Sequence, residues 1–180
     1  YGCSKYTAEK IHLAWQCECA DRRLLIVRPG VVYGAGEGGN VTRMLHFLRK
    51  GIFMYLGNRH VRKSGIYVKE LCNVMDWSME QLENPAFCNI RAGAAVVNAS
   101  FQPPPSLEEY VNVICSVGGF NPPAISIPYR LLYMASFFFM GIGGIHPTRI
   151  RKLVRPNIII PDHLVQSNYP WKWTLQTAFE

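Results

Sequence analysis

The chain has 180 residues, of which 49% are hydrophobic and 17% are charged, and its formal net charge is +7. This balance excludes an intrinsically disordered or fibrous protein, and the length suits one core or one domain with a small appendage. The positive charge favours anionic partners, such as nucleic acid, membrane headgroups or the phosphates of a small ligand. The alternative is that the acidic part of a longer protein lies outside this chain.

Strands and helices alternate in the first half of the chain. Residues 1–20 predict a helix because they are rich in Ala, Glu, Lys and Leu and contain no Pro. Residues 23–32 predict a buried strand that Pro29-Gly30 interrupts near its end. The elements expected next are helices at 40–50 and 69–83 and strands at 53–56, 65–68 and 86–90.

The second half is less regular. Ser106 and Glu109 have the spacing of a capping box and predict the start of a helix. A short strand is expected at 125–127, helices at 129–139 and 147–155, and turns from 161 onward. We therefore expect an α/β segment followed by a smaller mixed lobe.

The cysteines and histidines do not have the spacings of metal sites. Six cysteines lack the paired pattern of a zinc site or a disulfide framework, and the five histidines show no HExxH motif. We therefore expect no metal, and free thiols in a reducing cytoplasm. The most apolar stretch, 131–145, is shorter than the about 20 residues of a membrane helix, so we expect no membrane insertion.

The first chemically informative pair is Tyr1 and Lys5, which are one helical turn apart and share a helix face. A phenol with a pKa of about 10 is a poor acid or base at neutral pH, but a nearby ammonium lowers that pKa. The pair can therefore exchange a proton with a substrate hydroxyl or carbonyl while a hydride moves to or from a nicotinamide. The alternative is a solvated surface pair.

Four ordered motifs resemble those of the extended short-chain dehydrogenases/reductases, in particular the NAD-dependent epimerase/dehydratase family. They are YGCSKYTAEK (1–10), RPGVVYGAG (28–36), GIYVKEL (65–71) and FCNIRAG (87–93). The stretch 146–164 is more similar to nucleotide-sugar epimerases than to steroid dehydrogenases.

The resemblance implies the C-terminal part of a Rossmann-like, doubly wound parallel sheet together with a small mixed α/β substrate lobe. Residues 1–85 would supply the last Rossmann elements, interleaved with segments of the substrate lobe. Residues 86–180 would form mainly that lobe and the C-terminal tail.

The resemblance also implies NAD or NADP as cofactor, a nucleotide-linked sugar as substrate and a homodimer of the full-length protein. Tyr1 would be the general acid/base, and Lys5 would lower its pKa and bind the nicotinamide ribose. The nicotinamide carboxamide would meet the backbone of Pro29, Gly30, Val31 and Val32. A Ser or Thr partner of Tyr1 and the glycine-rich phosphate loop are expected upstream of Tyr1, so the fragment alone is expected to be inactive.

The expected substrate-binding residues are Lys63, Arg62 and Asn40. Lys63 stands where the family usually has Arg, and Lys cannot form the bidentate fork of a guanidinium with a phosphate. The Asp-Asp that usually follows the next strand is Lys69-Glu70 here. An exposed, solvated basic turn is the alternative to a diphosphate site.

Gly34, Gly36 and Gly39 spell GxGxxG, the pattern of a dinucleotide fingerprint. That motif requires an acidic residue about 20 positions on, where this chain has only Gly57, Asn58 and Arg59. We therefore assign the glycines to the Val-Tyr-Gly-x-Gly loop of the family.

Three other functions stay open at this point. One is a hydroxysteroid-type dehydrogenase of the same superfamily, and another is a non-catalytic binding or structural relative. The third, a basic nucleic-acid-binding module, predicts affinity that falls steeply with salt. We favour the epimerase or dehydratase, with no nucleic-acid partner.

Overall fold

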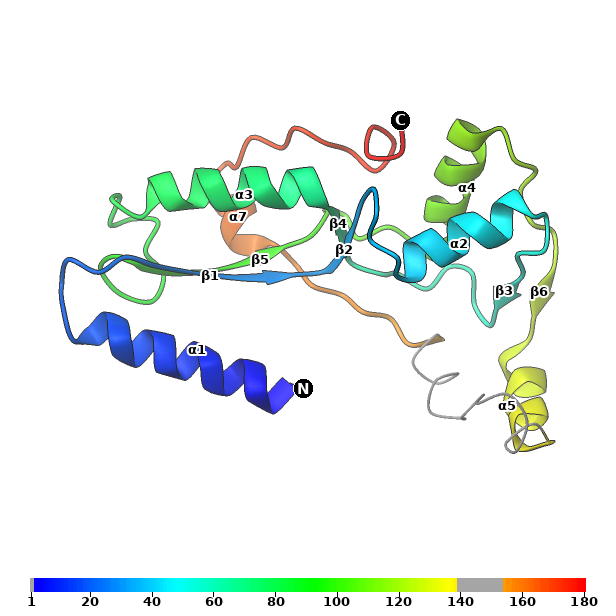
Figure 1. The fold of residues 1–180 in the computed structure, drawn as a ribbon, viewed down its shortest axis with the longest axis horizontal. Helices are drawn as coiled ribbons and strands as arrows, with labels where there is room; N and C mark the ends of the chain where they lie inside the picture. Colours follow the sequence, from blue (N-terminus) through cyan, green and yellow to red (C-terminus); the bar gives the residue numbers. More distant parts are fainter. Residues whose placement is uncertain (1, 139–153) are drawn as a thin grey trace.

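Three pairs of parallel strands form the framework of the chain (Figure 1). The computed structural model describes residues 2–138 and 154–180. The pairs are β1 (Leu24–Pro29) with β5 (Ala94–Ala99), β2 (Val31–Tyr33) with β4 (Gly65–Tyr67), and β3 (Tyr55–Leu56) with β6 (Ser126–Ile127). Parallel pairs need long crossover connections, and helices supply them here. The α/β prediction is confirmed.

Helices cover both faces of the β1–β5 pair. Helix α1 (Gly2–Cys17) lies on one side of β1 and α3 (Val68–Gln81) on the other, and both contact it (Figure 1). The short helix α7 (Asp162–Gln166) contacts β5. A strand covered on both faces has apolar residues at consecutive positions, as in the Leu-Leu-Ile-Val run that opens β1.

The second lobe is built around α2 (Asn40–Arg49) and α4 (Leu107–Gly118), which pack together, with α5 (Tyr129–Phe138) following β6. The predicted capping box is confirmed: Glu109 N donates to Ser106 Oγ over 3.1 Å, and Ser106 N donates to Glu109 Oε2 over 2.6 Å. Gly119 caps the C-terminus of α4, and its φ of 67° lies in the left-handed region that favours glycine.

The buried apolar residues form two clusters, one in each part of the chain. The cluster beside β1 and β5 contains Ile66, Val74, Leu82, Phe87, Ala95, Val97, Ala99, Leu164 and Tyr169. The cluster of the second lobe contains Tyr33, Met44, Leu48, Tyr55, Phe101, Tyr110, Val111, Ile114 and Cys115. The C-terminal tail joins both, because Tyr169 belongs to the first cluster and Phe179 packs against the second.

One predicted strand is wrong. Residues 86–90 form turns, because Asn84 Oδ1 accepts a hydrogen bond from Ala86 N over 3.0 Å and Asn84 O accepts one from Phe87 N over 3.0 Å. The strand of this region is β5, which the sequence shows only as a run of small and β-branched residues. The helix α7 was also missed within the expected turns, and the helix expected at 147–155 falls largely outside the described residues.

The C-terminal tail packs onto both parts of the chain. Lys172 N and Trp173 N donate to the carboxylate of fully buried Glu70, over 3.3 and 3.0 Å. The ring of Phe179 stacks on Tyr33, with centroids 5.2 Å apart. Glu70, which departs from the family's Asp-Asp, therefore holds the tail in place.

Within the part of the chain that the structure describes, no helix combines the length and the apolar character needed to cross a membrane.

Candidate active site

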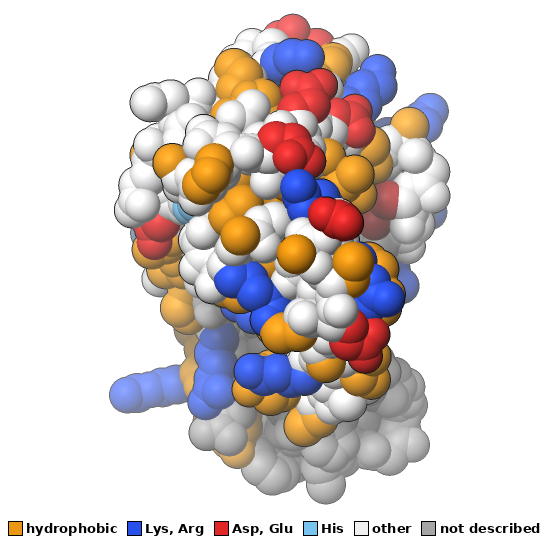
Figure 2. Space-filling model, turned by 90° about the vertical axis from the view of Figure 1, so that its left-hand side faces the viewer, with side chains coloured by type: hydrophobic (Ala, Val, Ile, Leu, Met, Phe, Trp, Pro, Cys, Tyr) orange, Lys and Arg blue, Asp and Glu red, His pale blue; other side chains and the backbone are white. Residues whose placement is uncertain are grey.

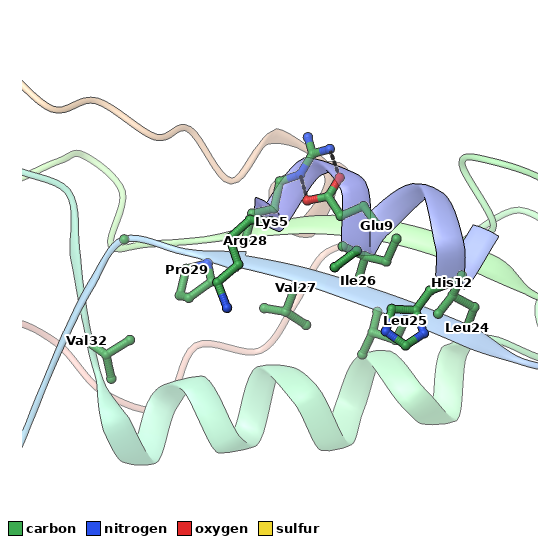
Figure 3. A pocket seen from close by; sticks show the side chains of 12 residues that line it. Lys5, Glu9, His12, Leu24, Leu25, Ile26, Val27, Arg28, Pro29 and Val32 are labelled. Carbon is green, nitrogen blue, oxygen red and sulfur yellow. Dashed lines mark hydrogen bonds and ion pairs between the residues drawn. The ribbon is translucent and has the colours of Figure 1, made fainter. Parts of the chain in front are cut away.

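A groove of about 690 Å³ runs between α1 and β1 (Figure 3). Strand β1 lines it with half-buried apolar side chains, and α1 lines it with Lys5, Glu9 and His12. Lys5 lies at the Arg28–Pro29 end of the groove and His12 at the Leu24 end (Figure 3). The groove therefore brings the lysine of the Tyr-Lys pair to the carboxyl end of β1. Tyr1 lies outside the described residues.

A bidentate ion pair joins the two walls of this groove. Arg28 donates from Nε and Nη2 to the two carboxylate oxygens of Glu9, over 2.9 and 2.5 Å (Figure 3). The hydrogen bond from Arg28 holds the pKa of Glu9 below its ordinary value, and the same bond raises the pKa of Arg28. Both groups therefore stay charged at neutral pH.

At the carboxyl end of β1, the backbone passes between two strands. Gly30 N donates to Ala99 O over 2.8 Å, and Val31 N donates to Ser64 O over 2.9 Å. A Cβ at residue 30 would lie 2.8 Å from Ser64 O, so the close approach of two backbones requires glycine here. Ligands of open α/β sheets bind at such carboxyl ends.

Arg62 and Lys63 lie just before β4, beside this turn. Arg62 Nη1 donates to Pro104 O over 2.6 Å, and Lys63 Nζ donates to Arg155 O over 2.5 Å. Burial lowers the pKa of Lys63. The two basic residues thus tie three segments of the chain together.

Comparisons with known proteins match the first half of the chain to one family. The family model described as "NAD dependent epimerase/dehydratase family" matches residues 1–90. The chain belongs to the NAD-dependent epimerase/dehydratase family. The match contains both walls of the groove.

One relative is the N-acetyl-alpha-D-glucosaminyl-diphospho-ditrans,octacis-undecaprenol 4-epimerase of Escherichia coli O157:H7. The two sequences are 27% identical over 140 residues, which cover 77% of this chain and 40% of the relative.

Solved structures show the same fold. The chain is similar to a UDP-N-acetylglucosamine 4-epimerase from Bacillus cereus, with a TM-score of 0.66, 13% identity and coverage of 99% of this chain and 51% of that one. A human epimerase family protein crystallised with NADPH has a TM-score of 0.62 and 19% identity, over 87% of this chain and 47% of that one. This chain thus spans about half the length of these epimerase-family structures, and the predicted Rossmann-like part-fold is confirmed.

The glycines at 34, 36 and 39 do not form an open phosphate loop in this family member. Glu37 carries its carboxylate to the start of α2, where it accepts hydrogen bonds from Gly39 N over 2.6 Å and Thr42 N over 2.7 Å. Helix N-termini bind phosphates through backbone amides of this kind. Here the Glu37 carboxylate accepts hydrogen bonds from two of these amides, so it lies where a phosphate would bind. This contact supports the assignment of the glycines to the Val-Tyr-Gly-x-Gly loop.

The structure does not join Asn40 to the two basic residues by any described contact. Asn40 is exposed at the start of α2, after the carboxyl end of β2, whereas Arg62 and Lys63 precede the amino end of the parallel strand β4. Among the residues described, no three His, Cys, Asp or Glu side chains gather as metal ligands.

Sequence reasoning missed two features of the site. Glu9 and Arg28 appeared only as letters of two family motifs, 19 positions apart, and nothing in either motif predicts that they meet. Glu70 was noted in the sequence only because Lys69-Glu70 stands where the family usually has Asp-Asp. One feature of the sequence could have predicted the contact between Glu9 and Arg28. The two residues have opposite charges and stand on α1 and β1, which the family places side by side.

Proposed function

We propose that the full-length protein is an NAD(P)-dependent epimerase or dehydratase that acts on a nucleotide-linked sugar. The observation that carries the proposal is the position of Lys5 in the groove beside Pro29 and Gly30. A lysine one helical turn from Tyr1 then lies next to the turn expected to meet the nicotinamide. When bound, NAD(P) supplies the site that accepts and returns the hydride.

The residues present fit the nicotinamide end of such a cofactor. Lys5 offers an ammonium to the ribose hydroxyls, and the backbone of Pro29, Gly30, Val31 and Val32 offers polar groups to the carboxamide. Tyr1 takes the proton of the sugar hydroxyl and returns it, with the Lys5 charge lowering the pKa of the phenol.

We assign the diphosphate of the substrate to Lys63 and Arg62, with Asn40 as a further substrate contact. Lys63 is half-buried and burial lowers its pKa, so an anion near its ammonium would offset that effect by favouring the charged form. Both basic residues lie beside the Pro29-Gly30 turn, so a sugar diphosphate bound there would place its sugar near the groove.

We further propose a cytoplasmic homodimer. The six cysteines are free, four of them exposed, and α1 exposes Tyr6 (59%), Ile11 (63%) and Trp15 (43%). Exposed apolar side chains along one helix fit contact with a second copy. In Figure 2, acidic side chains lie among basic ones in the upper part of the face, and basic side chains predominate in its lower part.

The test uses the full-length protein with NAD, NADP and UDP-sugars, and follows epimer or dehydration product by NMR. We expect Tyr1→Phe to lower kcat by about 10²–10⁴-fold, the range attributed to a positioned acid/base. Tyr6→Phe, in helix α1, is the matched control and should keep its activity. Free UDP should compete with the substrate. Equal activity of both variants would reject the role of Tyr1.

A further inference from the structure

Helix α1 carries Lys5 of the Tyr-Lys motif but is held to the sheet by few residues. Gln16 is its one buried residue, and Glu9 and Leu13 are half-buried. Positions 9, 13 and 16 are spaced by four and three, so they lie on one face of the helix. The orientation of α1 therefore depends on what this face contacts.

The C-terminal end of α1 is held by a network of hydrogen bonds. Gln16 Nε2 donates to Arg22 O and to Ala92 O, each over 3.1 Å. The guanidinium of Arg91 donates to Gln16 Oε1 and to Leu13 O. These bonds fix the last turns of the helix, which are the turns farthest from Lys5.

Nearer its start, α1 is tied to β1 by Glu9. Its carboxylate receives both bonds of the Arg28 fork, a geometry that fixes angle as well as distance. Glu9 is one helical turn from Lys5, and Arg28 is adjacent to Pro29 and Gly30. The ion pair thus joins the two parts of the candidate site at the point where they face each other (Figure 3).

We propose that Glu9 and Arg28 are positioning residues that set the distance between the turn of α1 that carries Lys5 and the Pro29-Gly30 turn of β1. The inference rests on the proposed function, because it assigns to the pair the alignment of Tyr1 and Lys5 with cofactor and substrate. Neither residue touches the reacting atoms in this account.

A positioning role differs from a stabilising role in what it affects. The side chains of Arg28 and Glu9 are 52% and 21% exposed, and ion pairs with that much solvent add little to stability. A displacement of about 1 Å in a catalytic group can nevertheless cost about 10²-fold in rate. The pair is therefore expected to affect turnover far more than the melting temperature.

The experiment compares Glu9→Gln with Glu83→Gln in the full-length protein. Glu83 is the matched control, because it also forms a bidentate pair with an arginine, Arg23, over 3.0 and 3.1 Å. Arg23 directly precedes the first residue of β1, at the other end of the strand from Arg28. We expect Glu9→Gln to lower kcat by about 10-fold or more, with little change in the KM for the nucleotide sugar. Glu83→Gln should keep the activity of the unaltered protein.

Two readouts separate positioning from general damage. The limb of the pH–rate profile that belongs to Tyr1 should move to higher pH in Glu9→Gln, because a displaced Lys5 no longer lowers the phenol pKa. The double variant Glu9→Arg with Arg28→Glu should recover part of the lost rate. Identical kcat and pH profiles for Glu9→Gln and Glu83→Gln would overturn the proposal.

Amide hydrogen exchange tests the pair without any assay of activity. In Glu9→Gln, we expect faster exchange in residues 5–11 and unchanged protection of residues 13–17 and of β1. Unchanged exchange throughout α1 would reject the proposal even if the full-length protein has another activity. Faster exchange in a protein that shows no epimerase or dehydratase activity would reject the proposed function alone.

Discussion

The second lobe and the groove between α1 and β1 are held together by different means. The second lobe has a fully buried core, in which Val111 and Ile114 are 0% and 2% exposed. The groove between α1 and β1 has half-buried walls joined by a charged pair. The lobe therefore draws its stability from close packing, whereas the groove depends on the alignment of a few polar contacts. Substitutions in the lobe should therefore lower mainly the free energy of unfolding, whereas loss of the charged pair in the groove should lower mainly the turnover rate.

The largest expected loss of stability lies in the lobe. Ile114→Ala removes buried methylene groups from the cluster around Tyr33 and Tyr110 and should lower the free energy of unfolding by about 2–5 kcal/mol. Leu25→Ala, in the half-buried wall of the groove, should cost less. Urea unfolding of both variants measures the difference, and equal losses would contradict the comparison.

A smaller loss is expected at the turn that leads out of the groove. In Gly30→Ala, the new methyl group would lie 2.8 Å from Ser64 O, a backbone atom that cannot turn aside. Overpacking of this kind costs about 1–3 kcal/mol. Thermal unfolding together with NAD titration measures it, and we expect both the melting temperature and the affinity to fall. An unchanged melting temperature and an unchanged affinity for NAD would mean that β2 and β4 move apart at little cost in free energy.

Loss of the capping box of α4 should cost less again. Ser106→Ala removes the acceptor for Glu109 N, and such caps contribute about 1 kcal/mol. Urea unfolding should show this loss with the activity retained, because α4 lies in the lobe and away from the groove. Thr174→Ala is the comparison variant, because its hydroxyl also accepts a bond from a backbone N–H, that of Thr177, but in the exposed tail, where the loss should cost less.

The smallest stability effect is a pH dependence at the groove. The pKa of Glu9 is lowered in the folded protein, so its pair with Arg28 stabilises the fold above the unfolded-state pKa of about 4.3. That stabilisation is lost as pH falls through the folded-state pKa. Because the pair is exposed, we expect less than about 1 kcal/mol, measured as the difference in acid unfolding between the unaltered protein and Glu9→Gln.

The sequence predicted the elements whose signals are local. The capping box of Ser106, the helix predicted at 40–50 and the break at Pro29-Gly30 each depend on neighbouring residues, and each was found. Strand β5 was missed because small residues in a buried parallel strand carry no alternation, while the buried Phe87 made a turn resemble a strand.

The candidate site was predictable only in part, for a related reason. Lys5 and the Pro29-Gly30 turn were expected from motifs, and the structure places both in one groove. The ion pair between Glu9 and Arg28 joins two elements, so its existence depends on the packing of α1 against β1. The support that Glu70 gives to the tail spans more than 100 positions and has no local signature.

The most direct test of the account is a titration of the full-length protein with NAD(H) and NADP(H), comparing Lys5→Met with Gly36→Asn. Residue 36 has a φ of 81° and open space around it, which Asn tolerates better than other side chains. We predict that Lys5→Met weakens binding of the preferred cofactor and that Gly36→Asn leaves it unchanged. Loss of binding in Gly36→Asn alone would place the cofactor at the glycine loop and contradict the assignment of the groove.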